Sequence, residues 1–219
     1  MIYCDIHTHQ PPANPEDLAV IAADIRQPFP LRSGRYAVGI HPWHADKEAL
    51  PLLRTLATHS QVAAIGEAGL DKLASISLSL QEEVFTAQAR LAGEVGKPLI
   101  IHCVKAWPEL IAIRQTVRSD IPWIIHGFRG NDKLAGQLLR FGFYLSFGIH
   151  CQSEAVRMAW KARRLFAETD NENVDIREVY SSIAVRLSIS EEILSQAILE
   201  NFRMIQLYTE NAPSKTKPD

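Results

Sequence analysis

Residues 98–102 read Pro-Leu-Ile-Ile-His, and residues 122–126 have the same form, Pro-Trp-Ile-Ile-His. Each segment is a short apolar run that stops at a histidine. Short runs of this kind, separated by longer stretches with helical periodicity, are typical of buried strands in βα units. Such units predict a parallel sheet with helices packed against it.

Five further apolar runs of similar length are spread along the chain. They occupy residues 2–6, 36–40, 62–65, 143–147 and 164–167. Residues 18–25 (LAVIAADI) fit an eighth strand and a short helix equally well. Seven or eight parallel strands favour an α/β fold of the distorted TIM-type (β/α) barrel over an open sheet.

Helical patterns fill the spaces between these runs. The clearest are at 80–95, 107–117, 132–141, 174–187 and 190–199. Ser190 is a plausible N-cap for the last of these, because two glutamates follow it. We expect residues 1–210 to form a single domain, with 211–219 as a flexible polar tail.

Composition narrows the function classes. Of the 219 residues, 47% are hydrophobic and 22% charged, as in ordinary soluble proteins. A net charge of −2 and a pI near 6.4 argue against a broadly basic nucleic-acid surface. No apolar run reaches the ~20 residues of a membrane span, and the N-terminus lacks the pattern of a signal peptide. We expect a cytoplasmic monomer without a membrane partner.

Histidines and carboxylates gather at the carboxyl ends of the predicted strands. In a parallel barrel these ends meet at one mouth, where active sites are built. Imidazole nitrogens and carboxylate oxygens are the usual ligands of zinc and similar divalent ions. The predicted metal ligands are His7, His9, Glu67, His102, His126 and Asp170.

The spacing of His7 and His9 suits a shared ion, because residues two apart on a strand point to the same face. Asp5 lies on that face too, and we expect it to support a histidine by a hydrogen bond. Six ligands are too many for one catalytic zinc, which typically has three protein ligands. We therefore expect two divalent ions with Glu67 between them. Zinc or manganese suits four imidazoles better than magnesium does.

Other conspicuous side chains have ordinary interpretations. Cys103 adjoins His102 and is a conceivable thiol nucleophile, but core packing is favoured because no dedicated base is evident. The three cysteines are widely spaced, which predicts free thiols. Tryptophans 43, 107 and 123 are interpreted as core residues in preference to base-stacking platforms.

Seven motifs run in order along nearly the whole chain. They are 5–9 (DIHTH), 39–42 (GIHP), 66–71 (GEAGLD), 97–102 (KPLIIH), 126–128 (HGF), 142–148 (GFYLSFG) and 168–170 (ETD). The ordered set resembles the TatD family of metal-dependent deoxyribonucleases, within the amidohydrolase superfamily. The resemblance implies a distorted TIM barrel in which His7, His9 and Asp170 bind one metal, His102 and His126 bind the other, and Glu67 bridges them.

The chain departs from this family pattern at the rim of the expected site. The family usually has an arginine two or three residues after the histidine that ends the fourth of these motifs, where residues 102–105 read HCVK. It usually has a proline after ETD, where residues 171–174 read NENV. The segment between His9 and Gly39 is also short by roughly a helix.

The expected function is cleavage of phosphodiester bonds in DNA, single-stranded or at ends, by a metal-activated hydroxide. Asp170 and Glu67 are the predicted catalytic residues, and Asp71 is expected to support the loop of Glu67. The predicted substrate contacts are His41, His44, Lys105 and Arg129. Two alternatives stay open: the same site acting on another ester or amide bond, such as that of aminoacyl-tRNA, and a non-catalytic binding module stabilised by its metals.

Overall fold

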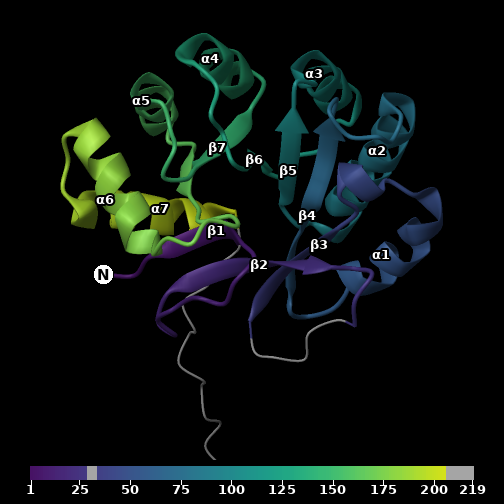
Figure 1. Cartoon of the computed structure of the whole chain (residues 1–219), viewed down its shortest axis with the longest axis horizontal. Coiled ribbons are helices and arrows are strands. Elements are labelled where there is room, and N and C mark those ends of the chain that lie inside the picture. The colour runs from purple at the N-terminus through teal and green to yellow at the C-terminus, as the bar shows by residue number, and fades with distance from the viewer. Residues whose placement is uncertain (29–33, 206–219) are drawn as a thin grey trace, which may run out of the picture.

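The computed structural model describes residues 1–28 and 34–205, so the predicted tail at 211–219 lies outside the described residues. Eight parallel strands lie side by side in chain order (Figure 1). They are β1 (Cys4–Thr8), β2 (Leu18–Asp24), β3 (Arg35–Gly39), β4 (Val62–Asp71), β5 (Leu99–Val104), β6 (Trp123–Ile125), β7 (Phe143–Phe147) and β8 (Leu165–Ala167). The predicted TIM-type α/β barrel is therefore confirmed, and residues 18–25 belong to a strand.

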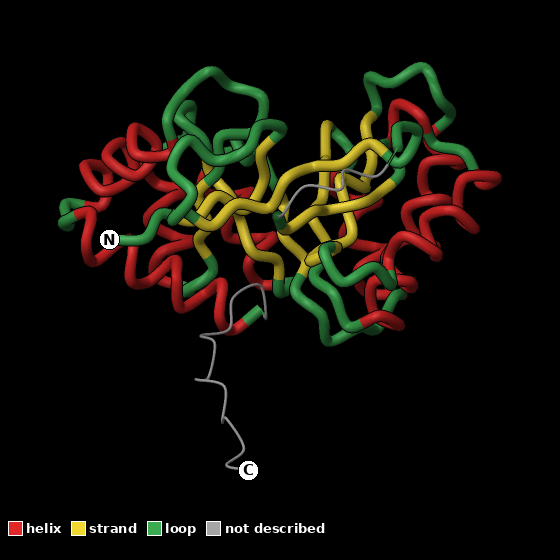
Figure 2. Tube along the Cα trace, turned by 90° about the horizontal axis from the view of Figure 1, so that it is seen from below, coloured by secondary structure: helices red, strands yellow, loops and turns green. Residues whose placement is uncertain are grey.

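Helices lie on both sides of the strands (Figure 2). They are α1 (Leu50–Ala57), α2 (Leu78–Val95), α3 (Trp107–Thr116), α4 (Asp132–Arg140), α5 (Ser153–Lys161), α6 (Ile176–Leu187) and α7 (Glu191–Met204), with two short 3-10 helices at Pro42–His44 and Lys47–Ala49. Ser190 caps α7 as predicted, because its side chain accepts a hydrogen bond from the Ile193 N–H. Within the described residues no helix separates β1 from β2 or β2 from β3, so this part of the barrel has a thinner outer layer.

The barrel closes between its first and last strands. The main-chain N–H of Asp170 donates to the carbonyl of His7 over 2.9 Å, and the N–H of His9 donates to the carbonyl of Asp170 over 3.1 Å. These bonds pair the end of β1 with the segment just after β8, where Thr8 and Asp170 form a parallel bridge. Closure therefore brings together residues that are more than 160 positions apart in sequence.

The strands are apolar on both faces because the helices cover one face and the barrel interior the other. In β5 and β6, Leu99, Ile101, Trp123 and Ile125 are fully buried. Their parallel register places Leu99 beside Trp123 and Ile101 beside Ile125. The histidines that follow these runs are thereby carried to the same end of the barrel.

Strand β4 is longer than the predicted run at 62–65, and glycine accounts for the difference. Gly66 has φ of +147° and Gly69 has φ of +156°, values that side chains disfavour. A Cβ on Gly69 would lie 1.8 Å from the carbonyl oxygen of His102, and one on Gly66 would lie 2.5 Å from that of Ile100. The two glycines let β4 continue beside β5 through a shift in register, which places Glu67 within the strand.

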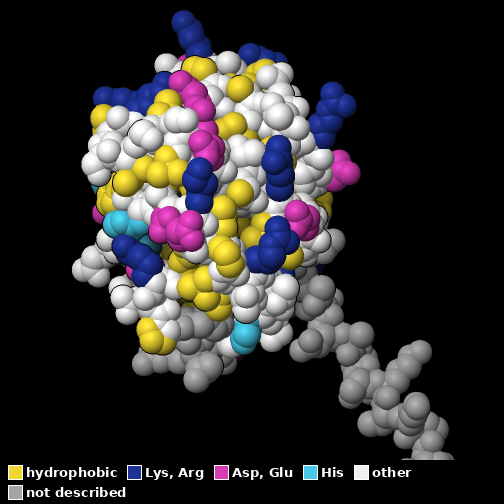
Figure 3. All heavy atoms as spheres, turned by 90° about the vertical axis from the view of Figure 1, so that its right-hand side faces the viewer, with side chains coloured by type: hydrophobic (Ala, Val, Ile, Leu, Met, Phe, Trp, Pro, Cys, Tyr) yellow, Lys and Arg dark blue, Asp and Glu magenta, His cyan; other side chains and the backbone are white. Residues whose placement is uncertain are grey.

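The face over α1 to α3 carries charges of both signs, intermixed with apolar atoms (Figure 3). Three ion pairs link elements on this side of the molecule: Lys47–Glu83, Arg54–Glu94 and Lys72–Glu109. Exposed pairs of this kind contribute little stability each, so the face is best described as solvated. Among the described helices, none is long and apolar enough to cross a membrane.

Candidate metal centre

The six predicted ligands converge at the mouth of the barrel, where five lie at the carboxyl ends of β1, β5, β6 and β8 and Glu67 lies within β4. Their donor atoms fall into overlapping groups in which every atom lies within 4.8 Å of the others. These groups are His7–Glu67–His126, His7–His9–Asp170, His41–Glu67–His102 and His126–Glu168–Asp170. The structure thus adds His41 and Glu168 to the residues whose atoms could reach a metal.

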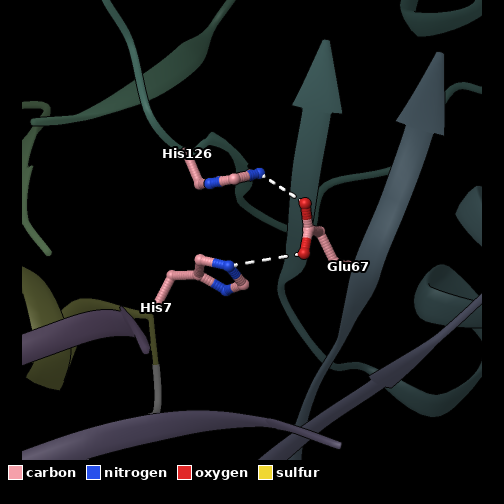
Figure 4. A group of neighbouring side chains, drawn as sticks. All are labelled: His7, Glu67 and His126. Atoms are coloured by element: carbon pink, nitrogen blue, oxygen red, sulfur yellow. Dashed lines mark ion pairs between the residues drawn. The ribbon is translucent and has the colours of Figure 1, made fainter. Parts of the chain in front are cut away.

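Glu67 lies at the middle of the cluster and turns its two oxygens to different neighbours (Figure 4). Its Oε1 lies 2.8 Å from His126 Nε2 and 3.0 Å from His102 Nδ1. Its Oε2 lies 3.5 Å from His7 Nε2 and 3.8 Å from His9 Nε2. The carboxylate therefore connects a group on β5 and β6 with a group on β1.

Asp170 completes the group on β1. Its Oδ1 lies 3.5 Å from His7 Nε2 and 3.6 Å from His9 Nε2. The main-chain bonds between β1 and the end of β8 set this approach, because they fix Asp170 directly beside His7 and His9. Asp170 has φ of +53°, a conformation that aspartate tolerates better than most residues.

The unsatisfied ring nitrogens of His7 indicate that a metal ion fits these residues. His7 is fully buried, yet neither of its ring nitrogens has a hydrogen-bond partner. A buried polar atom without a partner is costly, and coordination of a cation would satisfy one of these nitrogens. Neutral imidazole and carboxylate together form a donor set suited to zinc or manganese.

The local electrostatics favour ligand-competent protonation states at the carboxylates. Burial alone would raise the pKa of Glu67, but the neighbouring imidazoles, with His126 foremost, hold that pKa well below its usual range. Burial likewise opposes the lowering of the Asp170 pKa, which His7 and His126 bring about. The pKa of His9 is lowered by burial and by the proximity of His7, which favours its neutral form.

Asp71 supports the β5 side of the centre. Its Oδ2 lies 3.2 Å from His102 Nε2 and accepts a 2.7 Å hydrogen bond from the indole N–H of Trp43. Its main-chain N–H donates to the side chain of Gln81 over 2.7 Å. Carboxylate–histidine contacts of this type orient the ring of a metal ligand.

Glu168 has the corresponding position behind His126. It is 1% exposed, and its Oε1 lies 3.6 Å from His126 Nδ1 while accepting a hydrogen bond from the Gly127 N–H. This carboxylate was not predicted as a site residue, although it belongs to the ETD motif. The available signal was a second acidic residue at the end of the apolar run that becomes β8.

Two glutamines of α2 were also missed. The side chain of Gln88 accepts a hydrogen bond from the Ile40 N–H and donates one to the Ile40 carbonyl. The side chain of Gln81 makes the same two hydrogen bonds with the main chain of Asp71. They therefore fix the main chain directly before His41 and at Asp71. Both are buried and seven residues apart. A polar residue recurring on the core-facing side of a helix is the signal that could have identified them.

Asp5 has partners different from the predicted histidine ring. Its Oδ2 accepts from the Thr169 hydroxyl over 2.6 Å, and its Oδ1 accepts from the main-chain N–H of His7 and of Thr169. Burial and the charge of Glu168 raise the pKa of Asp5 to about 7, against the opposing effect of the Thr169 bonds. Asp5 thus ties β1 to the end of β8 through main-chain and hydroxyl groups.

A cavity of about 540 Å³ opens above the centre. His41 and His44 line it together with His9, Glu67, His102, His126 and Asp170. Lys105 is exposed and does not line this cavity, and Arg129 lines a separate small one, where its Nη2 lies 3.2 Å from Glu172. A larger cavity, of about 1060 Å³, lies where the chain enters β5 and β6, at the opposite end of the barrel, and contains none of the predicted ligands.

The predicted roles of Cys103 and the three tryptophans can be compared with their burial in the structure. Burial raises the pKa of the Cys103 thiol to about 12, so a thiolate nucleophile is disfavoured. Trp123 is fully buried, and Trp107 is partly buried against the core, in keeping with a packing role. Trp43 is 55% exposed, so its interpretation as a core residue is wrong.

Comparison with known proteins gives a consistent result. A family model described as TatD related DNase matches residues 31–206. The chain is 31% identical over 189 residues to YcfH of Escherichia coli, named as an uncharacterized metal-dependent hydrolase, covering 76% of this chain and 71% of that protein. It is 35% identical over 144 residues to a Cronobacter sakazakii protein named 3′-5′ ssDNA/RNA exonuclease TatD, covering 60% of this chain and 55% of that protein.

Solved structures share the fold at lower identity. The TatD homologue YJJV of Escherichia coli superimposes with a TM-score of 0.76 at 18% identity, covering 93% of this chain and 97% of that one. A TatD family hydrolase of Entamoeba histolytica gives 0.73 at 15% identity, with the same coverage. The barrel, the converging histidines and carboxylates and the matched family model lead to one conclusion: this chain belongs to the TatD family of metal-dependent hydrolases.

Proposed function

We propose that this protein is a two-metal phosphodiesterase that shortens single-stranded DNA from one end. The observation that carries the proposal is that the two carboxylate oxygens of Glu67 face different histidines. Its Oε1 faces His102 and His126, and its Oε2 faces His7 and His9. A carboxylate that faces two sets of nitrogens with separate oxygens is suited to bridge two ions.

In this proposal His7, His9 and Asp170 hold one ion, His102 and His126 hold the other, and Glu67 is shared. Divalent ions at such a site supply an activated water and stabilise charge on phosphoryl oxygens. His41, whose Nε2 lies 3.2 Å from Glu67 Oε1, is assigned to the substrate in this proposal. Zinc or manganese is the favoured identity because imidazole dominates the donor set.

The protein's own groups have distinct roles in this proposal. Asp170 is partly exposed to the cavity and keeps a lowered pKa, so it is ionised at neutral pH and accepts the proton of the attacking water. His41 lines the same cavity and is placed to contact a phosphate oxygen. The walls of the barrel mouth hold the reacting groups in one orientation, which lowers the entropic part of the barrier.

Nucleic acid is the proposed substrate because relatives carry that activity in their names. Besides the Cronobacter protein, a Yersinia pseudotuberculosis protein named 3′-5′ ssDNA/RNA exonuclease TatD is 39% identical over 116 residues. That match covers 51% of this chain and 44% of the relative. The intermixed charges on the face of Figure 3 favour a substrate that engages the mouth locally over one that wraps the surface.

The test begins with protein stripped by a chelator and reloaded with magnesium, manganese or zinc. Single-stranded DNA labelled at either the 3′ or the 5′ end is then incubated with the wild type, Glu67→Gln and Asp170→Asn. Glu200→Gln is the matched control, because Glu200 is an exposed glutamate on α7. We expect metal-dependent shortening from one end that Glu67→Gln and Asp170→Asn abolish and the control retains.

Two outcomes would contradict the proposal. Absence of shortening with any metal, while the protein still binds metal, would exclude DNA and direct attention to ester, amide or aminoacyl-tRNA bonds. Shortening that survives in Glu67→Gln would exclude the shared carboxylate as the basis of the activity.

A further inference from the structure

Trp43 occupies an unusual position for a tryptophan. It is 55% exposed and lines the 540 Å³ cavity that also contains Glu67, His102 and Asp170. Tryptophan is mostly buried in folded proteins, so an indole exposed at the mouth of a polar site indicates a contact with something other than the core. The large cavity at the other end of the barrel shares no residue with this one.

The indole is held in a fixed orientation. Its N–H donates a 2.7 Å hydrogen bond to Asp71 Oδ2. Its ring stands edge-on to His41, with centroids 4.8 Å apart at 81°, and lies 6.2 Å from His102 at 77°. The indole is thus held against the two histidines and Asp71, while the residue stays 55% exposed. A preorganised aromatic ring loses little entropy when a ligand stacks on it.

The adjoining wall of the cavity suits an uncharged planar group. Small or apolar side chains line the cavity here, namely Ala22, Ala23, Ile25, Ile40 and Ala49, together with His44 and Asp46. The two charged residues at the end of β2 neutralise each other, because Arg26 forms a bidentate pair with Asp24, with Nη2–Oδ2 at 2.7 Å and Nε–Oδ1 at 2.9 Å. The volume lies in the range of pockets for small ligands.

We propose that Trp43 is a stacking platform for the nucleobase of the nucleotide whose phosphate lies at the metal centre. The inference rests on the proposed function and deepens it, since it assigns the wall formed by β2 and Trp43 to the base and the centre around Glu67 to the phosphate. Base–aromatic stacking depends little on base identity, so this site selects for a base without selecting which one.

Binding to the metal-loaded protein tests this without requiring turnover. The probes are deoxyadenosine monophosphate and 2-deoxyribose 5-phosphate, which carries the same phosphate without a base. The readout is the ratio of the two affinities by calorimetry, because a change at the metals affects both ligands and cancels. We expect the wild type to prefer the nucleotide by about 5- to 150-fold, the range given by one stacked base.

Three variants make the test specific. Trp43→Leu should reduce the affinity ratio to near one, whereas Trp43→Phe should retain most of it, because phenylalanine keeps a stacking ring but lacks the N–H. Leu73→Ala is the matched control, since Leu73 is 67% exposed and lies outside the cavity. Metal content is measured for each variant.

The outcomes separate this inference from the proposed nuclease activity. Equal affinities in the wild type, or a ratio unchanged in Trp43→Leu, would overturn it. A ratio lost equally in Trp43→Phe and Trp43→Leu would also overturn it, because the N–H bond to Asp71 would then be the cause. A preserved base preference in a protein that does not shorten DNA would support the platform while refuting the nuclease.

Discussion

The two sides of the candidate metal centre are positioned by different means. On the side of β1 and β8, main-chain hydrogen bonds between His7, His9 and Asp170 place the ligands. On the side of β5 and β6, buried carboxylates stand behind the ligands, with Asp71 beside His102 and Glu168 beside His126. Glu67 belongs to both sides through its two oxygens.

This difference predicts where the centre is vulnerable. Main-chain pairing survives most side-chain substitutions, so the β1 and β8 side should depend mainly on its ligands themselves. The β5 and β6 side depends in addition on Asp71 and Glu168, which contact the imidazole rings of His102 and His126. Outer partners of this kind typically change metal affinity or activity by about 10- to 100-fold.

The largest effect is expected for Glu67→Gln, which removes the carboxylate common to both sides. The variant should lose metal from both groups and reduce hydrolysis by more than the ~100-fold typical of outer partners. Elemental analysis and turnover measure the two effects, with Glu200→Gln as control. Retention of full metal content would show that Glu67 does not connect the two sides.

Asp71→Asn should act on one side alone. Loss of the charge beside His102 is expected to lower the affinity for one of the two metal ions by about 10- to 100-fold and to leave the affinity for the other unchanged. Competition titration with a chelating dye resolves the two equivalents. Asp120→Asn is the matched control, because Asp120 lines the cavity at the other end of the barrel. Equal weakening of both equivalents would contradict the independence of the sides.

Asp5→Asn should change stability with pH more than it changes activity. The pKa of Asp5 is raised by burial to about 7, above the value of about 3.9 in an unfolded chain, so the folded state binds this proton more tightly. The free energy of unfolding therefore falls as pH rises from about 4 to about 7, by about 2–3 kcal/mol between pH 5 and pH 7 for this group.

The measurement is urea unfolding of metal-free protein at those two pH values. The difference between them should be smaller in Asp5→Asn than in the wild type by that amount, because asparagine does not titrate. Activity should fall by less than in Asp71→Asn. An identical pH dependence in the two proteins would refute a protonated Asp5.

The smallest effect is expected at the thiols, one on each side. Burial raises the pKa of Cys4 on β1 and of Cys103 on β5 to about 12. Neither should react with a disulfide reagent at about pH 8 until the protein is denatured, because only the thiolate attacks. Since the folded pKa exceeds the unfolded one, these groups lower stability only as pH rises above about 8.5. Rapid labelling of either thiol in the native protein would show that its side opens.

Several features could be predicted from local patterns. The apolar runs and the polar residues that end them identified the strands and the residues gathered at the mouth, because parallel strands share one carboxyl end. The extent of β4 could not be predicted in the same way. Its continuation to Asp71 depends on the close approach of β5 to Gly66 and Gly69, which is a contact between distant segments.

The outer contacts of the site were the least predictable. Asp5 was expected to reach a histidine ring, but the closure of the barrel places Thr169 beside it instead. Lys105 and Arg129 are close in sequence to His102 and His126, yet neither lines the cavity above the centre. Each follows its histidine by three residues and lies beyond the end of its strand, since β5 ends at Val104 and β6 at Ile125.

The fold class and the residue types at the mouth follow from local patterns, because strand periodicity and the order of the motifs are properties of the chain. The division of those residues into two sides follows from the folded arrangement. That arrangement turned the two oxygens of Glu67 to different histidines, placed Glu168 and Asp71 behind the ligands and left Trp43 exposed in the cavity. These relations follow from barrel closure and register, which bring together side chains that no local pattern connects.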